Sequence, residues 1–269
     1  MSRPRVLITG ATGFLGSHAV AECARLANVV TLSRHGADIE CDIAALGSLA
    51  AALDAVRPDY VVHLAAMSRM SDCSASPEQA RAVNVLPAKA LADRFGPQLL
   101  FVSTDLVFDG RSAPYAPLAS VGPLSIYGQT KAEAEELVLA AGGRVARLPL
   151  LFGADAQSRG PTGAVREALK SGRPIYLYTN EYRTPLHCRD AARGLSDLVF
   201  SGPRDRITHL NGPERISRWD FAQRFCALHG LPTELLTAVE CQDATRPRDV
   251  SLSGPWQSPR ELDAMLLDS

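Results

Sequence analysis

The sequence predicts an α/β fold, with helices on both faces of a doubly wound parallel sheet and a smaller lobe built by the C-terminal part. Three observations predict it. Short apolar runs, typical of strands buried on both faces, alternate with helical segments through the first 150 residues. A glycine-rich turn joins the first apolar run to the first helix. The 269 residues suffice for one large core and a small second lobe.

In the first half of the chain, strands and helices are expected to alternate. The expected strands are short apolar runs without helical period, and the expected helices are longer periodic segments. Pro87 lies inside the third helix and is expected to kink it. The expected strands are 6–9, 28–33, 39–43, 60–66, 99–104 and 144–148, and the expected helices are 16–26, 44–56, 77–95 and one from 127 onward.

In the second half the alternation loosens, so the sequence predicts no sharp domain boundary. Ser217 stands directly before a helical segment, where an N-cap is expected. We expect residues 1–150 to form the main sheet domain, which also receives strands and helices from about 182–212. Residues 151–269 are expected to form most of the smaller, discontinuous lobe. The expected helices are 161–169, 189–200 and 218–229, and the expected strands or extended segments are 175–178, 182–187 and 207–212.

The turn after the first strand has the spacing Gly-x-x-Gly-x-x-Gly. Glycines let the backbone turn tightly and approach a pyrophosphate, and the next helix N-terminus offers free N–H groups to that anion. The bare pattern also fits an ordinary glycine-rich turn, but its place between strand and helix favours dinucleotide binding. The residues expected to contact the cofactor here are Gly10, Thr12, Gly13, Phe14, Leu15 and Gly16.

The ends of the next strands predict further cofactor contacts. An NAD-selective site usually has an acid after the second strand, where this chain has Arg34, and the first acid is Asp38. Because a guanidinium suits a 2′-phosphate, the sequence favours NADPH, with NADH and a solvated Arg34 as alternatives. Asp42 is placed to bond an adenine amine. The residues expected to contact the cofactor at these strand ends are Arg34, Asp42, Ile43, Leu64, Ala65 and Ala66.

The stretch from Ser103 to Lys131 carries the candidate chemistry. A strand is expected to end at Thr104, where open α/β sheets place their active sites. Tyr127 and Lys131 are four residues apart in a helical pattern, so they share one face. We expect the Lys131 ammonium to lower the pKa of Tyr127 from about 10, which would make the phenol a proton donor near neutral pH. An isolated pair is usually a solvated helix face, but the glycine turn favours catalysis.

Composition argues against several classes of partner. The net charge is −1, so there is no electrostatic case for binding nucleic acid or a membrane. The first apolar run is too short for a signal peptide, and no stretch reaches the length of a membrane-spanning helix. The six cysteines are scattered, which favours reduced thiols over zinc or disulfides. We expect a cytoplasmic protein without a metal site, and a homodimer is left open.

Several strings together have the pattern of a known family. They are residues 9–16, 103–110 (S-T-D-L-V-F-D-G), 127–131 (Y-G-Q-T-K), Arg183-x-Pro185 with Asp190, Asn211-Gly212 and 246–252. With them the chain resembles, over nearly its whole length, the extended short-chain dehydrogenase/reductase family of the NAD-dependent epimerase/dehydratase superfamily. It is most similar to the dTDP-4-dehydrorhamnose reductase branch. The resemblance implies a Rossmann-like fold and NADPH-dependent reduction of a nucleotide-linked 4-keto-6-deoxy sugar.

The resemblance also implies roles for individual residues. Thr104 would hydrogen-bond the substrate carbonyl oxygen and Tyr127 would donate the proton. Lys131 would hold the nicotinamide ribose and tune the phenol. Asp105 and Arg183 would face the substrate, with the guanidinium directed at its phosphates or its sugar.

Two departures from the branch leave the substrate and the function open. Leu106 stands where the branch usually has Tyr, and Leu150 stands where it tends to have Trp, so the identity of the sugar does not follow. Related dehydratases place a Glu after the position of Asp105, and its absence counts against dehydration. The alternatives are a nucleotide-sugar epimerase with tightly bound NAD and a non-catalytic regulatory subunit resembling the β subunit of methionine adenosyltransferase.

Overall fold

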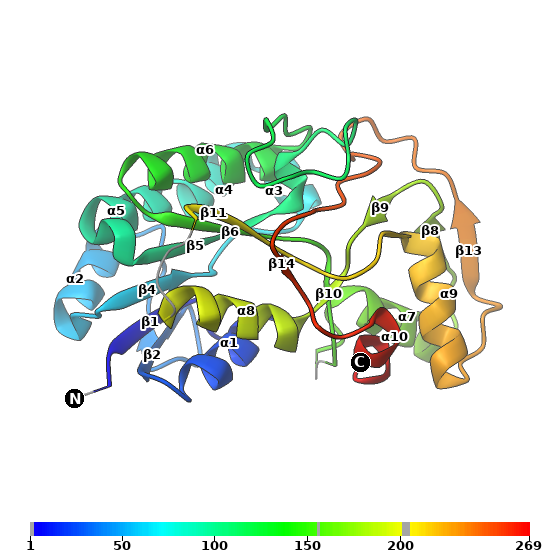
Figure 1. Ribbon diagram of the computed structural model, residues 1–269, viewed down its shortest axis with the longest axis horizontal. Helices are drawn as coiled ribbons and strands as arrows, with labels where there is room; N and C mark the ends of the chain where they lie inside the picture. Colours follow the sequence, from blue (N-terminus) through cyan, green and yellow to red (C-terminus); the bar gives the residue numbers. More distant parts are fainter. Residues whose placement is uncertain (1–2, 155–156, 201–204) are drawn as a thin grey trace.

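The main feature of the computed structural model is a parallel sheet of eight strands (Figure 1). The structure describes residues 3–154, 157–200 and 205–269. The strand order is β14-β11-β6-β5-β4-β1-β2-β3, so the order reverses between β1 and β4 and confirms the doubly wound topology. The strands are β1 (Arg5–Thr9), β2 (Asn28–Ser33), β3 (Ile39–Glu40), β4 (Tyr60–His63), β5 (Leu99–Thr104), β6 (Arg144–Leu148), β11 (Ile207–Asn211) and β14 (Trp256–Gln257).

Helices cover both faces of this sheet, as Figure 1 shows. Two helices pack side by side on one face, and the others lie on the opposite face, where their apolar residues form a second core layer. Both faces of the central strands are therefore buried, which explains why those strands read as continuous apolar runs. The first face carries α1 (Gly16–Cys23) and α8 (Cys188–Phe200), and the second carries α2 (Leu46–Val56), α4 (Pro77–Asn84), α5 (Leu86–Phe95) and α6 (Ile126–Ala140).

The smaller lobe is built from short, discontinuous elements. Two strand pairs in it are parallel and one is antiparallel. Ser217 caps α9 as expected, because its Oγ accepts a hydrogen bond of 3.0 Å from the backbone N–H of Asp220. The helices are α7 (Gly160–Ser171), α9 (Arg218–His229) and α10 (Leu262–Leu267), and the strand pairs are β7 (Leu151–Phe152) with β10 (Leu186–His187), β8 (Ile175–Tyr178) with β13 (Leu236–Val239), and β9 (Tyr182–Arg183) with β12 (Ile216–Ser217).

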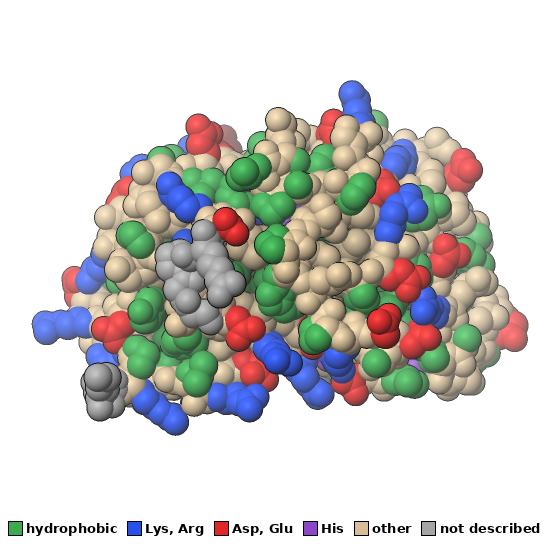
Figure 2. All heavy atoms as spheres, viewed as in Figure 1, with side chains coloured by type: hydrophobic (Ala, Val, Ile, Leu, Met, Phe, Trp, Pro, Cys, Tyr) green, Lys and Arg blue, Asp and Glu red, His purple; other side chains and the backbone are tan. Residues whose placement is uncertain are grey.

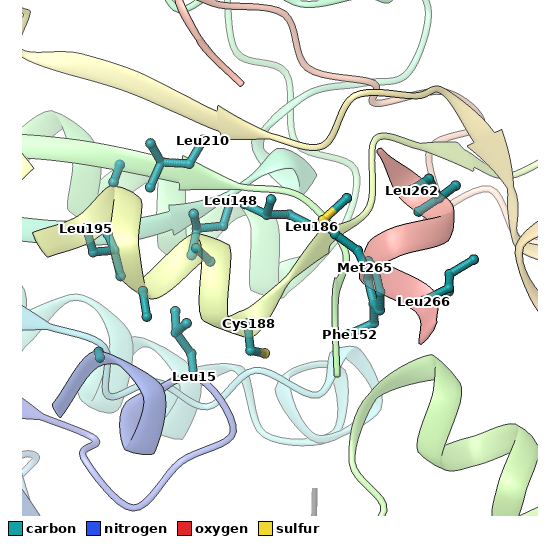
Figure 3. Packing of buried hydrophobic residues seen from close by; sticks show 14 of the residues in the cluster. Leu15, Leu148, Phe152, Leu186, Cys188, Leu195, Leu210, Leu262, Met265 and Leu266 are labelled. Atoms are coloured by element: carbon teal, nitrogen blue, oxygen red, sulfur yellow. The ribbon is translucent and has the colours of Figure 1, made fainter. Parts of the chain in front are cut away.

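The lobe and the main sheet share one apolar core. In Figure 3, Leu15 (directly before α1) and Leu195 of α8 belong to the same buried cluster as Phe152 and Met265 of the lobe. α10 sits on this cluster next to β10, and Met265 of α10 belongs to it together with Leu186 of β10. Among the described residues, the lobe and the main sheet therefore do not have separate hydrophobic cores.

The structure corrects several expected elements. The single helix expected over 77–95 is two helices, since α4 ends at Asn84 and α5 begins at Leu86. Pro87 is in the first turn of α5, where its missing N–H costs nothing, whereas in the middle of a longer helix it would remove a hydrogen bond. The third and fourth strands also end earlier than expected, at Glu40 and His63.

Some short elements were not predicted at all. The sheet receives α8 and β11 from the expected region, but it also receives β14, which lies near the end of the chain. A two-residue strand is too short to show a hydrophobic periodicity, so the local pattern around Trp256 does not predict it. The other elements missed are α3 (Met70–Ala75), β7, β12, β13 and α10.

Candidate active site

A cleft of about 820 Å³ opens at the carboxyl ends of β1, β4 and β5, where the strand order reverses. Its walls come from the glycine turn, the segment after β4, the end of β5 and the first turns of α6. Open α/β sheets bind their ligands at this place. Every residue expected to contact the cofactor lines the cleft: Gly10, Thr12, Gly13, Phe14, Leu15, Gly16, Arg34, Asp42, Ile43, Leu64, Ala65, Ala66, Tyr127 and Lys131.

The glycine turn is packed so tightly that side chains would not fit. Gly10 has φ +70°, and a Cβ there would come within 2.8 Å of the backbone of Ala65. A Cβ on Gly16 would lie 2.2 Å from the carbonyl oxygen of Gly10. The turn therefore presents bare backbone at the start of α1, and that geometry fits the pyrophosphate of a dinucleotide.

The side chains after β2 favour an extra phosphate on the ribose. Asp38 accepts hydrogen bonds from the backbone N–H and the hydroxyl of Thr31, at 3.0 and 2.8 Å, and does not line the cleft. Arg34 lines the cleft, is exposed and has no hydrogen bond or ion pair within the described part of the chain. Asp42 lines the cleft further along and accepts a 3.0 Å hydrogen bond from the N–H of Ala44. This end of the cleft thus offers a free cation where an NAD-selective site has an acid.

Thr104, Tyr127 and Lys131 all line the same cleft. Thr104 is the last residue of β5, and the other two lie in the first turns of α6. Ser125 begins this helix, because its Oγ accepts a 3.1 Å hydrogen bond from the N–H of Gly128. A Cβ on Gly128 would lie 2.3 Å from the carbonyl oxygen of Leu106, so glycine here brings α6 against the end of β5.

Lys131 is buried, with 2% of its surface exposed. Its Nζ donates a 2.7 Å hydrogen bond to the carbonyl oxygen of Val102 and lies 3.9 Å from the centre of the Phe101 ring. Burial lowers the pKa of Lys131 to about 7, and the nearby Glu135 carboxylate opposes this shift. The amine is therefore a mixture of charged and neutral forms near neutral pH.

The pKa expected for Tyr127 is wrong in direction. Burial raises the pKa of its phenol above the usual value, and the negative charge of Asp105 raises it further. A hydrogen bond with Thr104 and the charge of Arg183 lower the pKa, but by less. The Lys131 amine donates to the carbonyl oxygen of Val102 and lies over the Phe101 ring, and no hydrogen bond joins it to the phenol. At neutral pH the phenol keeps its proton.

Asp105 and Arg183, which were expected to face the substrate, are both buried in the structure. Asp105 begins the 3₁₀ turn η2 (Asp105–Val107) and is 1% exposed, and Arg183 is 6% exposed. The Arg183 Nη1 donates to Asp105 Oδ1 at 2.7 Å, and its Nη2 donates to Glu181 at 3.4 Å. Neither residue lines the cleft. The guanidinium is held by two buried carboxylates, which the one-dimensional pattern could not reveal.

Sequence reasoning missed another group of residues on the cleft wall. All but Ser103, which lies in β5, follow β4, the strand next to the point where the strand order reverses, and that topology could have pointed to them. Arg69 is exposed and stands at the start of α3, and Asp72 lies in the first turn of that helix. The missed lining residues include Met67, Ser68, Arg69, Asp72, Gln79 and Ser103.

Within the described ranges, no group of three or more His, Cys, Asp or Glu side chains could hold a metal ion. None of the helices in those ranges has the length and apolar character needed to cross a membrane. No disulfide joins any of the six buried cysteines. Figure 2 shows acidic and basic side chains interspersed over the viewed face.

Comparison of the sequence with characterised proteins finds two kinds of relative. The dTDP-4-dehydrorhamnose reductase of Mycobacterium tuberculosis is 30% identical over 260 residues, which cover 90% of this chain and 81% of that protein. Methionine adenosyltransferase 2 subunit beta of Xenopus laevis is 30% identical over 257 residues, which cover 87% of this chain and 75% of that protein.

Comparison with solved structures confirms the fold. A dTDP-4-dehydrorhamnose reductase from Bacillus anthracis, solved in complex with NADP, superposes with a TM-score of 0.87 at 20% identity, covering 98% of this chain and 97% of that one. A dTDP-glucose 4,6-dehydratase from the same organism, in complex with NAD, has a TM-score of 0.82 at 16% identity, covering 98% and 94%.

The family model agrees with these relatives and with the motifs in the sequence. The model described as RmlD substrate binding domain matches residues 4–256, which is nearly the whole chain. The resemblance to the dTDP-4-dehydrorhamnose reductase branch is confirmed by this match together with the Mycobacterium tuberculosis relative. The chain belongs to the RmlD substrate binding domain family.

Proposed function

We propose that this protein is an NADPH-dependent reductase of a nucleotide-linked 4-keto-6-deoxy sugar. The reductase relatives support an oxidoreductase activity. The observation that carries the finer proposal is the shared cleft, because the glycine turn, Arg34 and the group Thr104, Tyr127 and Lys131 all line it. A dinucleotide laid along the glycine turn would therefore extend toward the phenol.

Each of these residues would then have its own role in the reduction of a ketone. NADPH, when bound, supplies the hydride that reduces the carbonyl carbon. Tyr127 gives its proton to the carbonyl oxygen, and the raised pKa means that the phenol is protonated and ready as an acid at neutral pH. Lys131 faces the same cleft and would hold the nicotinamide ribose. The smaller lobe of residues 151–269 would bind the sugar nucleotide.

Purified protein tests this proposal directly. With NADPH and dTDP-4-dehydrorhamnose or another 4-keto-6-deoxy nucleotide sugar, we expect the NADPH absorbance to fall and the sugar alcohol to form in equal amount. Nucleotide sugars without a keto group serve as the negative control. Absence of oxidation with every keto sugar tried would contradict the reductase proposal.

Cofactor choice is expected to depend on Arg34. The Arg34→Ala variant should bind NADPH about ten- to a hundredfold more weakly, because a charged hydrogen bond to the 2′-phosphate is lost, and NADH about as well as before. Dissociation constants from fluorescence titration measure both. Arg25→Ala removes an exposed arginine outside the cleft and should change neither. Equal weakening of both cofactors would remove Arg34 from 2′-phosphate recognition.

A second candidate function is that of a regulatory subunit. The relatives named methionine adenosyltransferase 2 subunit beta, from several vertebrates, support it at 27–30% identity. In that case the protein should co-elute with a methionine adenosyltransferase catalytic subunit in size-exclusion chromatography and should change its kinetics. NADPH oxidation with a keto sugar and no co-elution would favour the reductase.

A third candidate is an epimerase that retains its cofactor. The dTDP-glucose 4,6-dehydratase that was solved with NAD shares this fold, and this likeness supports the alternative of a bound NAD. Heat denaturation of freshly purified protein, followed by chromatography, would then release about one NAD⁺ per chain. A reductase that exchanges cofactor each turnover should release far less.

A further inference from the structure

A buried asparagine and a buried threonine join two parts of the cleft wall. One part is the segment 64–69 after β4, and the other is the start of α6, which carries Tyr127 and Lys131. Asn84 is the last residue of α4 and is 1% exposed, and Thr130 of α6 is 5% exposed. Neither is among the described residues that line the cleft, so an effect of either on a ligand must pass through their neighbours.

Asn84 holds the backbone of Met67, in the first of these parts, at both of its polar groups. Its Oδ1 accepts a 2.8 Å hydrogen bond from the N–H of Met67, and its Nδ2 donates to the carbonyl oxygen of Met67 at 3.0 Å. The Cys73 thiol donates to the same carbonyl oxygen at 3.2 Å. An amide turned the other way would set its NH₂ group against the backbone N–H, so the backbone of Met67 fixes the orientation of Asn84.

The Asn84 amide also reaches α6. Its Nδ2 donates to Thr130 Oγ1 at 2.9 Å, and Thr130 Oγ1 donates in turn to the backbone carbonyl oxygen of Tyr127 at 2.9 Å. These directions are fixed, because an amide nitrogen can only donate, a carbonyl oxygen can only accept, and a hydroxyl can do both. Three side-chain hydrogen bonds therefore connect the backbone of Met67 to the backbone of Tyr127, and no ionisable group takes part in them.

We propose that Asn84 and Thr130 are positioning residues, which fix the start of α6 and its Tyr127 and Lys131 side chains relative to the segment 64–69. Loss of the Thr130 hydroxyl would let these two parts of the wall shift against each other and would remove no group that touches a ligand. A shift of about 1 Å in a reacting group is enough to slow a reaction strongly. The effect on catalysis rests on the proposed reductase function, whereas the hydrogen-bonded link does not.

The Thr130→Val variant tests the link without any substrate, because it keeps the shape of the side chain and removes the hydroxyl. In ¹⁵N-labelled protein, the N–H of Met67 should exchange with solvent deuterium at least about tenfold faster than in the wild type, since Asn84 is less firmly held. The N–H of Leu7 in the centre of the sheet reports global unfolding and should change less. Thr130→Ser restores the hydroxyl and should restore slow exchange. Unchanged exchange at Met67, or equal acceleration at Leu7, would overturn the proposal.

Glu133→Gln is the matched control for the exchange measurement. Glu133 of α6 also joins α4, through an ion pair of 2.5 Å with Arg81, but both side chains are exposed and neither bonds the backbone of Met67 or Tyr127. Its loss should leave exchange at Met67 as in the wild type. An acceleration equal to that of Thr130→Val would mean that any weakening between α4 and α6 has this effect, which would contradict a specific role for Thr130.

Kinetics separate positioning from simple support of the fold. With a keto sugar that the wild type reduces, Thr130→Val should lower kcat about tenfold and leave the Kd of NADPH within about threefold, because the glycine turn and Arg34 are untouched. Thr130→Ser should recover most of the lost kcat. A folded Thr130→Val protein with the kcat of the wild type would overturn the positioning role. If Thr130→Val does not fold, Thr130→Ala removes the same hydrogen bonds and favours the helix. A wild type that reduces no sugar would refute the proposed function and leave the exchange result unaffected.

Discussion

The Tyr127→Phe variant should lose at least about a hundredfold in kcat for ketone reduction, because a positioned general acid contributes roughly this much to the rate. Its affinity for NADPH should stay within about twofold, since the glycine turn and Arg34 are untouched. Burial holds the phenol protonated at neutral pH, so wild-type kcat should also show no alkaline decline due to Tyr127 between about pH 6 and 9. Steady-state kinetics at saturating NADPH measure both.

Tyr176→Phe is the control for this measurement. Tyr176 is a largely exposed tyrosine of β8 that does not line the cleft, so removal of its hydroxyl should leave kcat unchanged. Normal turnover in Tyr127→Phe would remove the phenol from the mechanism.

The second large effect concerns stability and Lys131. Burial lowers its pKa to about 7 in the folded protein, whereas an unfolded lysine titrates near 10.5. Between these values the unfolded chain binds a proton that the folded protein does not, so the free energy of unfolding rises with pH by at most about 1.4 kcal/mol per pH unit. Below about pH 7 both states are protonated and the full penalty for the buried charge remains.

The Lys131→Met variant removes this dependence. Urea unfolding should show the stability of the wild type rising relative to the variant by about 2 kcal/mol between about pH 7 and pH 9. Lys89→Met is the matched control, because Lys89 is about half exposed and pairs with Asp93 on the surface of α5. Its stability difference from the wild type should stay nearly constant over that range. A constant difference for Lys131→Met as well would mean that the amine titrates normally.

The order of elements in the first half followed from the sequence because each element has its own local signal. β1, β2, β5 and β6 are five or six residues long and contain short apolar runs, and the glycine turn marks the join with α1. The lobe was harder to predict, because β9, β10 and β12 are two residues long and are held by pairing with distant segments. The break at Val85 was predicted only as a kink at Pro87.

The cleft residues were predictable because a parallel sheet gathers the ends of its strands at one edge. Gly10, Arg34, Thr104 and Tyr127 are far apart in sequence but reach the same cleft. The pKa values and hydrogen-bond partners of the cleft residues did not follow from their spacing in the sequence. The pKa of Tyr127 depends on burial and on Asp105, and the position of Lys131 depends on a carbonyl of β5. Burial and hydrogen-bond partners are properties of the folded chain, and no motif records them.

The apolar cluster that runs from α1 through α8 to α10 also limits how the molecule can move. A hinge that swung the lobe away from the sheet would expose Phe152, Leu186 and Met265 to water, and each such side chain costs about 1.5–3 kcal/mol to expose. The free-energy cost therefore disfavours substrate entry by rigid-body opening of the lobe. Ligands should enter through rearrangement of surface segments alone, and heat should melt the sheet and the lobe in one cooperative transition.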